Sequence, residues 1–269
     1  MIPCINQATV LTTNTKRFLE LSKAHNFAHV ELDIGKVEEW IAKDGRAALK
    51  SCLIDNTLTV VSLNAIENYP IVTEDEMKKS LRRCEEVIEL SNSLNCNIVV
   101  VNPNEVSAVD QVSLQMRFDE FMIETAKIAE AYDVHVGFEY VSYDNRIINS
   151  LAESLNGLTK WNCGVGLVLD VFHMYRSGEM VAEIPVKDRR QLWVFHVNDA
   201  PEIPIPVVRD SDRVMPLEGV INLREYITQL HTMEFDGPVS VELFNKKYWE
   251  MDPDQAIEKA RISLMKLGV

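Results

Sequence analysis

Four apolar segments in the second half of the chain share one feature, since each ends in a charged or ionisable side chain. The clearest is Val165–Asp170, in which apolar residues and one glycine lead directly into an aspartate, with His173 three residues further on. A run without a polar side is typical of a strand that is buried on both faces, as in parallel α/β sheets. The acid then stands at the carboxyl end of the strand, which faces the ligand in such proteins. The other three segments end at Glu139, His196 and Glu242.

Strand-like and helix-like segments alternate eight times along the 269 residues. The predicted strands are Ile2–Ala8, Ala28–Asp33, Leu58–Asn64, Cys96–Asn102, Val134–Glu139, Val165–Asp170, Leu192–His196 and Pro238–Glu242. The predicted helices are Thr15–Ala24, Val37–Leu53, Thr73–Ser93, Val112–Tyr132, Ile147–Leu158, Asn222–Met233 and a last one that begins at Pro253, while residues 178–190 read as short and mixed. Eight such repeats within about 250 residues predict an α/β fold, a (β/α)8 TIM barrel.

Two local patterns support this reading of the chain. Thr73 and Glu76 form a capping-box pattern, which marks the start of the third predicted helix. No G-x-G-x-x-G or P-loop follows a predicted strand, which counts against a nucleotide-binding open sheet. Because no linker or low-complexity run interrupts the alternation, we predict that residues 1–269 form a single domain.

The composition indicates which kinds of binding partner and which cellular compartment suit this protein. A formal net charge of −14 argues against nucleic acid, which requires a basic surface, but it does not repel a neutral polyol or a divalent cation. The sequence contains no apolar stretch near the roughly 20 residues that cross a bilayer, and its first residues do not resemble a signal peptide. Five scattered cysteines without a C-x-x-C motif indicate reduced thiols and a cytoplasmic protein: Cys4, Cys52, Cys84, Cys96 and Cys163. The oligomeric state stays open, a homo-oligomer included.

The four strand-end residues form a metal-ligand set when they are taken together. Singly, each has a simpler explanation, such as a hydrogen-bonded structural histidine, or an aspartate that caps a turn. In a barrel, however, the ends of consecutive strands are neighbours on one rim, and burying these groups together without a cation would be costly. Three carboxylates, one imidazole and no thiolate predict one divalent ion, Mn²⁺ or Co²⁺, with Mg²⁺ and Zn²⁺ as alternatives. Two positions of an octahedral ion then stay open for a ketone and its neighbouring hydroxyl.

Other polar and aromatic residues are predicted to line the pocket around this ion. His173 follows the aspartate by three residues, and the long proline-containing loop from Asp199 to Gly219 has the length of a functional loop. The predicted substrate contacts are Asn64, His173, Asp199, Arg213, Tyr248 and Trp249, and Glu31 ends a strand nearby.

At these residues the sequence resembles the xylose-isomerase-like barrels, a family of sugar isomerases and epimerases that also includes class IV apurinic endonucleases. Its metal ligands match Glu139, Asp170, His196 and Glu242, and its D-x-x-H motif matches Asp170-Val-Phe-His173. Further similar segments are Phe195–Ala200, Asp212–Val214 and Val239–Phe244. The chain departs from the family at Leu217, where a glycine is usual, and we expect this leucine to stiffen the turn and to add bulk near the pocket.

The resemblance is greatest to members that act on 2-keto-myo-inositol, and it implies a metal-dependent isomerase of inositol breakdown. The reaction would pass through an enediolate, with Glu139 and Glu242 both binding the metal and moving the proton, while His173 and Arg213 hold the substrate. A ketose 3-epimerase or an inosose dehydratase would use the same site. A phosphodiesterase that acts on abasic DNA would require further metal ligands and a basic groove, which the sequence does not display. A metal-binding barrel without turnover is the remaining alternative.

Overall fold

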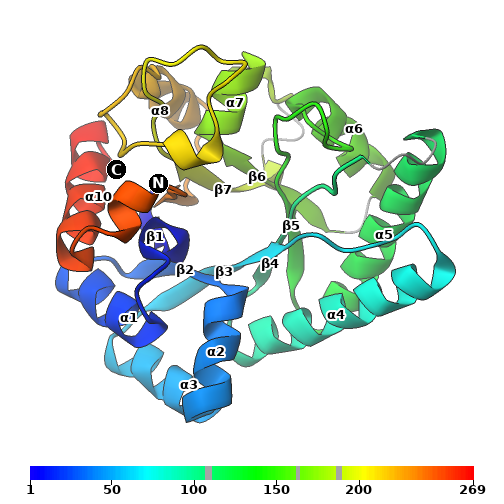
Figure 1. The fold of residues 1–269 in the computed structure, drawn as a ribbon, viewed down its shortest axis with the longest axis horizontal. Helices are drawn as coiled ribbons and strands as arrows, with labels where there is room; N and C mark the ends of the chain where they lie inside the picture. The colour runs from blue at the N-terminus through cyan, green and yellow to red at the C-terminus, as the bar shows by residue number, and fades with distance from the viewer. Residues whose placement is uncertain (107–110, 162–163, 186–189) are drawn as a thin grey trace.

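The structure is a computed structural model that describes residues 1–106, 111–161, 164–185 and 190–269. Eight parallel strands close into a barrel in sequence order, and β1 pairs with β8 (Figure 1). The strands are β1 (Ile2–Asn6), β2 (His29–Asp33), β3 (Thr59–Ile66), β4 (Ile98–Val101), β5 (His135–Phe138), β6 (Val165–Asp170), β7 (Leu192–Val197) and β8 (Pro238–Val241). The predicted (β/α)8 barrel is therefore confirmed.

Helices surround the strands on all sides of the barrel (Figure 1). They are α1 (Thr15–Ala24), α2 (Ile34–Asp44), α3 (Arg46–Asp55), α4 (Glu74–Ser93), α5 (Gln111–Ala131), α6 (Leu151–Trp161), α7 (Val171–Ser177), α8 (Leu223–Thr232), α9 (Lys246–Trp249) and α10 (Pro253–Leu267). The predicted capping box is present at the start of α4, where Thr73 accepts from the backbone of Glu76 and the glutamate bonds back. Among the described residues, none of the helices has the length and apolar character needed to cross a bilayer.

The structure corrects two helix predictions. The single helix expected over Val37–Leu53 is two helices, α2 and α3, because Gly45 between them has a φ of 82°, which a continuous right-handed helix does not allow. No helix was predicted directly after β6, but α7 begins there at Val171. The stretch 178–190, which was predicted to be short and mixed, contains a 3-10 helix at Val181–Glu183 in its described part. Residues 186–189 of that stretch lie outside the described residues, as does Cys163, and the other four cysteines are free.

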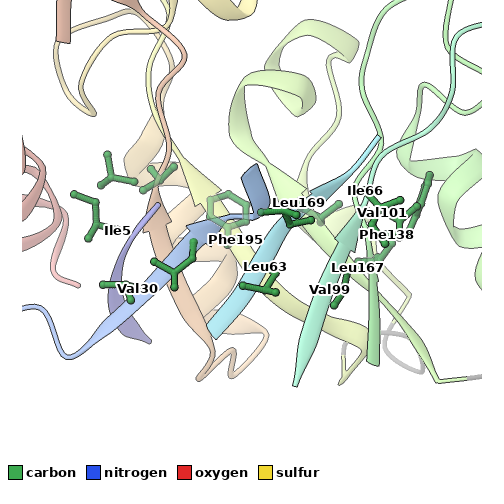
Figure 2. Packing of buried hydrophobic residues seen from close by; sticks show 14 of the residues in the cluster. Ile5, Val30, Leu63, Ile66, Val99, Val101, Phe138, Leu167, Leu169 and Phe195 are labelled. Atoms are coloured by element: carbon green, nitrogen blue, oxygen red, sulfur yellow. The ribbon is translucent and has the colours of Figure 1, made fainter. Parts of the chain in front are cut away.

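Side chains alternate along each strand between the helix layer and the barrel interior. On β6, Leu167 and Leu169 belong to the large hydrophobic core, part of which Figure 2 shows. Val168, between them, belongs to a separate small cluster, which consists of Cys4, Val61, Val100, Val168 and Val194, with Ala65, Ile98 and Trp193 packed against it. Because five different strands contribute to this cluster, it fills the barrel interior. Asp170 shares the inward side with Val168 and stands one step further toward the carboxyl end.

Gly166 in β6 is explained by the packing of this interior. A Cβ atom at this position would lie 2.2 Å from the indole ring of Trp193 on β7, which is far inside contact distance. Only a glycine at position 166 leaves room for the indole ring of Trp193. This packing explains why a glycine interrupts an otherwise apolar strand.

Candidate functional site

The barrel brings the four predicted ligands together at the carboxyl ends of β5 to β8. One ligand atom from each of Glu139, Asp170, His196 and Glu242 lies within 4.8 Å of the others. All four side chains are buried, and Asp170 pairs in register with His196 on the neighbouring strand. The strand periodicity places these residues on the inward side, so their convergence is a direct consequence of the fold.

His196 is oriented by a carboxylate on the far side of the barrel. Its Nε2 lies 3.1 Å from Glu31 Oε1, while its Nδ1 lies 2.9 Å from Glu139 Oε1 and 3.3 Å from Glu242 Oε2. Burial alone would lower the pKa of His196, but Glu242, Glu31 and Glu139 hold it well above its usual value. With Nε2–H directed at Glu31, Nδ1 is the nitrogen that faces the cluster and can bind a metal.

Glu31 is itself held by neighbouring polar groups. The hydroxyl of Ser62 and the amide of Asn64 both donate to Glu31 Oε2, the amide at 3.0 Å. Burial would raise the pKa of Glu31, yet His196 and the hydroxyls of Ser240 and Ser62 hold it at about 2. Glu31 is therefore an ionised acceptor for His196, and this role was not foreseen from its place at a strand end.

Each of the two glutamates is fixed by an asparagine amide. Asn102 Nδ2 donates to Glu139 Oε2 at 3.0 Å, and Asn6 Nδ2 donates to Glu242 Oε1 at 2.9 Å. Sequence reasoning missed both asparagines, although each ends or follows an apolar strand in the same way as the ligands do. Their shared position on β1 and β4 was the available signal.

A buried arginine offsets part of the negative charge of the cluster. Arg213 Nη1 donates to Asp170 Oδ2 at 2.7 Å and to Glu242 Oε2 at 3.1 Å, while Nη2 bonds Asp210 and lies 3.1 Å from His173 Nε2. The guanidinium also lies over the ring of Phe172, 4.8 Å from its centroid. These carboxylates raise the pKa of Arg213 despite its burial, so it stays charged.

His173 is a neutral member of this network. Burial lowers its pKa to about 4, Arg213 adds to that effect, and the carboxylate of Asp210 opposes it. Its Nε2 accepts from Arg213, which leaves Nδ1 to donate to the hydroxyl of Ser142 at 3.1 Å. The ring lines the pocket, and its role as a substrate contact stays a prediction.

A pocket of about 430 Å³ opens above the cluster. It is lined by Glu139, Glu242, His173 and Arg213, and by the amides of Asn6, Asn64 and Asn102. Asp170 and His196, which are almost completely buried, do not line it. The cluster therefore divides into two side chains that line the pocket, Glu139 and Glu242, and two that do not.

Three predicted substrate contacts lie away from this pocket. Asp199 accepts backbone N–H groups of the long loop, among them those of Gly219 and Ile221 at 2.9 Å, so it organises that loop. The hydroxyl of Tyr248 accepts from the backbone of Met215 and donates to Glu218. The indole of Trp249 donates to the carbonyl of Ala8 at 2.7 Å.

Leu217 also differs from its expected position. Its φ is 72°, the left-handed conformation that favours glycine, so this position of the loop suits a glycine although it holds a leucine. The side chain is 38% exposed and does not line the pocket, and the expected extra bulk near the pocket is therefore not present.

The donor set fits a divalent ion. Ligand bonds of about 2.0–2.2 Å place two ligands on opposite sides of an ion roughly 4 Å apart, and the four atoms already lie within 4.8 Å. Four buried carboxylates, those of Glu31, Glu139, Asp170 and Glu242, surround one arginine and one imidazole. This excess of buried negative charge favours a cation.

Comparison with known proteins agrees with this architecture. Inosose isomerase of Bacillus subtilis (strain 168) is 27% identical over 265 residues, which cover 96% of this chain and 94% of that protein. Inosose isomerase of Bacillus velezensis is 26% identical over 264 residues, with coverage of 96% and 94%. The solved structure of the IolI protein with a bound zinc atom has a TM-score of 0.90 and 25% identity, and the match covers 99% of this chain and 98% of that one.

A family model described as a xylose isomerase-like TIM barrel matches residues 19–267 of the chain, which includes all four residues of the cluster. The strand order of the barrel and the cluster at its carboxyl-end rim are consistent with this match. The chain belongs to the xylose isomerase-like TIM barrel family.

Proposed function

We propose that this chain is a divalent-metal-dependent isomerase that acts on a keto-inositol, such as 2-keto-myo-inositol. The relatives that align over almost its whole length are named inosose isomerases, and the similar IolI structure contains zinc. The observation that carries the proposal is the double position of Glu139 and Glu242, which belong to the ligand cluster and also line the pocket.

The cluster would hold one ion, for which Zn²⁺, Mn²⁺, Co²⁺ and Mg²⁺ are the candidates. When bound, such an ion polarises a ketone and stabilises negative charge on its oxygen. The ligands are Glu139, Asp170, Glu242 and the Nδ1 of His196.

The two glutamates supply the proton transfer. One carboxylate takes the proton from a hydroxyl-bearing carbon next to the ketone, and the C–H electron pair moves toward the ketone oxygen to give an enediolate. The proton then returns to the former ketone carbon, a hydroxyl proton is exchanged between the two oxygens, and the ketone has moved by one position without net oxidation. A positioned base of this kind contributes about 10²–10⁴-fold. Asn6 and Asn102 keep each carboxylate in a fixed orientation.

Arg213 and His173 are proposed to hold the substrate. Arg213 lines the pocket, and its Nε has no hydrogen-bond partner among the described residues. His173 beside it is neutral and is held by Ser142. Together they offer polar contacts for the hydroxyl groups next to the reacting carbons.

The test is a reaction in D₂O with 2-keto-myo-inositol and each of the four metals in turn, followed by NMR. We expect deuterium at the carbon next to the ketone and a product in which the ketone has moved to the neighbouring carbon. An inverted centre with the ketone in place would identify an epimerase instead, with a ketohexose as the matching substrate. Loss of water would identify a dehydratase, and incision of abasic DNA would identify a phosphodiesterase.

A further inference from the structure

The pocket also carries charged side chains that the proposed reaction does not use. Asp33 ends β2, Glu67 follows β3, and Arg146 belongs to the loop after β5, and all three line the pocket. None of the three belongs to the ligand cluster of Glu139, Asp170, His196 and Glu242.

Arg146 is fixed in place but keeps free donors. Its Nη1 donates to the carbonyl of Pro103 at 3.0 Å, and its Nη2 lies 3.6 Å from Glu105 Oε1. Its backbone forms a bridge to the same glutamate. Its Nε is buried and has no partner among the described residues. Because each Nη of a guanidinium carries two N–H groups, the donors that remain for a ligand are on Nη1 and Nη2.

Glu67 offers the complementary acceptor. Within the described part of the chain, its carboxylate forms no hydrogen bond and no ion pair. Desolvation raises the pKa of this exposed side chain, the charge of Arg146 lowers it, and the charges of Asp33 and Glu139 add to the rise. Asp33 next to them has one oxygen occupied by the backbone N–H of Lys36 at 2.8 Å. An acceptor-only group and a donor-only group thus face the same pocket with space between them.

We propose that Glu67 and Arg146 form a second recognition point, which binds a hydroxyl group of the substrate other than those held at the ligand cluster and selects uncharged polyols over anionic ones. A hydroxyl satisfies both partners at once, because it donates to the carboxylate and accepts from the guanidinium. A phosphate or carboxylate cannot donate to Glu67, and it would meet the charges of Asp33 and Glu67 against a single arginine whose charge Glu105 already offsets. The inference rests on the proposed isomerase function and specifies its substrate class.

The test measures binding separately from turnover. Titration calorimetry of the metal-loaded protein with myo-inositol and with a myo-inositol monophosphate compares two ligands with the same ring and different charge. We expect Arg146→Gln to weaken myo-inositol binding about 10-fold or more, because a hydrogen bond to a charged group is lost. Glu67→Gln should weaken it as well, and should reduce the discrimination against the phosphate by at least 10-fold. Arg146→Lys keeps the charge without the planar fork, so it should keep the discrimination and lose affinity.

Arg209→Gln is the matched control, because this exposed arginine lines the neighbouring cavity and not the pocket. It should bind both ligands as the wild type does, and thermal unfolding should verify that every variant is folded. If Glu67→Gln and Arg146→Gln bind both ligands with wild-type affinities, the pair is a solvated surface feature and the proposal is overturned. Absence of proton exchange by the wild type together with normal, variant-sensitive myo-inositol binding would instead reject the isomerase function and retain the recognition point.

Discussion

Glu31 on β2 and His196 on β7 face each other across the barrel interior, with Glu31 Oε1 3.1 Å from His196 Nε2. They are 165 residues apart in the chain. The contact directs Nε2 of the imidazole at Glu31, and it leaves Nδ1 directed at the cluster of strand-end carboxylates.

The first prediction concerns this contact. Glu31→Gln removes the ionised acceptor but keeps a similar shape. His196 then loses a partner that orients its ring and that makes the imidazole more basic. Loss of such a partner typically lowers metal affinity 10–100-fold. Competition with a chelating dye, read as metal retained at equilibrium, measures the change. Unchanged affinity would mean that Glu31 only fills the barrel interior.

The second prediction concerns Asp170. In addition to its place in the cluster, this aspartate accepts from the backbone N–H of Phe172 at 2.6 Å and caps α7. Asp170→Ala should therefore abolish metal content and activity, and loss of the cap alone should lower the free energy of unfolding by about 1 kcal/mol. Elemental analysis and chemical denaturation are the measurements. Asp170→Asn is the control that preserves a capping oxygen, and full metal occupancy in Asp170→Ala would contradict the ligand assignment.

The third prediction concerns proton transfer. Glu139→Gln and Glu242→Gln each keep an oxygen for the metal and remove one base. At least one variant should retain metal and substrate while it loses exchange of the proton next to the ketone, by 10²-fold or more. NMR in D₂O measures the exchange. Wild-type exchange in both variants would restrict the glutamates to ligation, and His173 would become the next candidate base.

The fourth prediction concerns pH. The folded pKa of His173 is about 4, against an ordinary value of 6.5, so between these values the unfolded chain binds a proton that the folded protein does not. The free energy of unfolding should therefore fall as the pH drops from about 6.5 to about 4, by about 3 kcal/mol from this group. Chemical denaturation of the wild type and of His173→Asn at several pH values isolates the contribution of His173 to the free energy of unfolding. Parallel curves for the two proteins would show that His173 titrates normally.

The barrel and its ligand cluster could be predicted because both depend on local periodicity. Apolar strands with a period of two place their last inward residue at the rim, and Glu139, Asp170, His196 and Glu242 all occupy that position. Asn6 and Asn102 occupy it too, but an amide at a strand end carries no charge that would single it out.

The remaining errors arise where position depends on tertiary contacts. Asp199, Tyr248 and Trp249 follow the right strands, yet their polar atoms bond loop and backbone groups instead of lining the pocket. Only the folded loop determines these partners, and its course has no repeating pattern. The break at Gly45 was overlooked because the apolar spacing continues on both sides of it.

The interior cluster of Cys4, Val61, Val100, Val168 and Val194, with the indole that Gly166 admits, has a consequence for turnover. These side chains fill the barrel below the rim, so the site does not continue through the barrel to its other end. Under the proposed function, substrate then enters and product leaves on the carboxyl-end side of the barrel, and one molecule has to depart before another can arrive. The two compounds consequently compete for one site, so accumulated product should slow the forward reaction as a competitive inhibitor does.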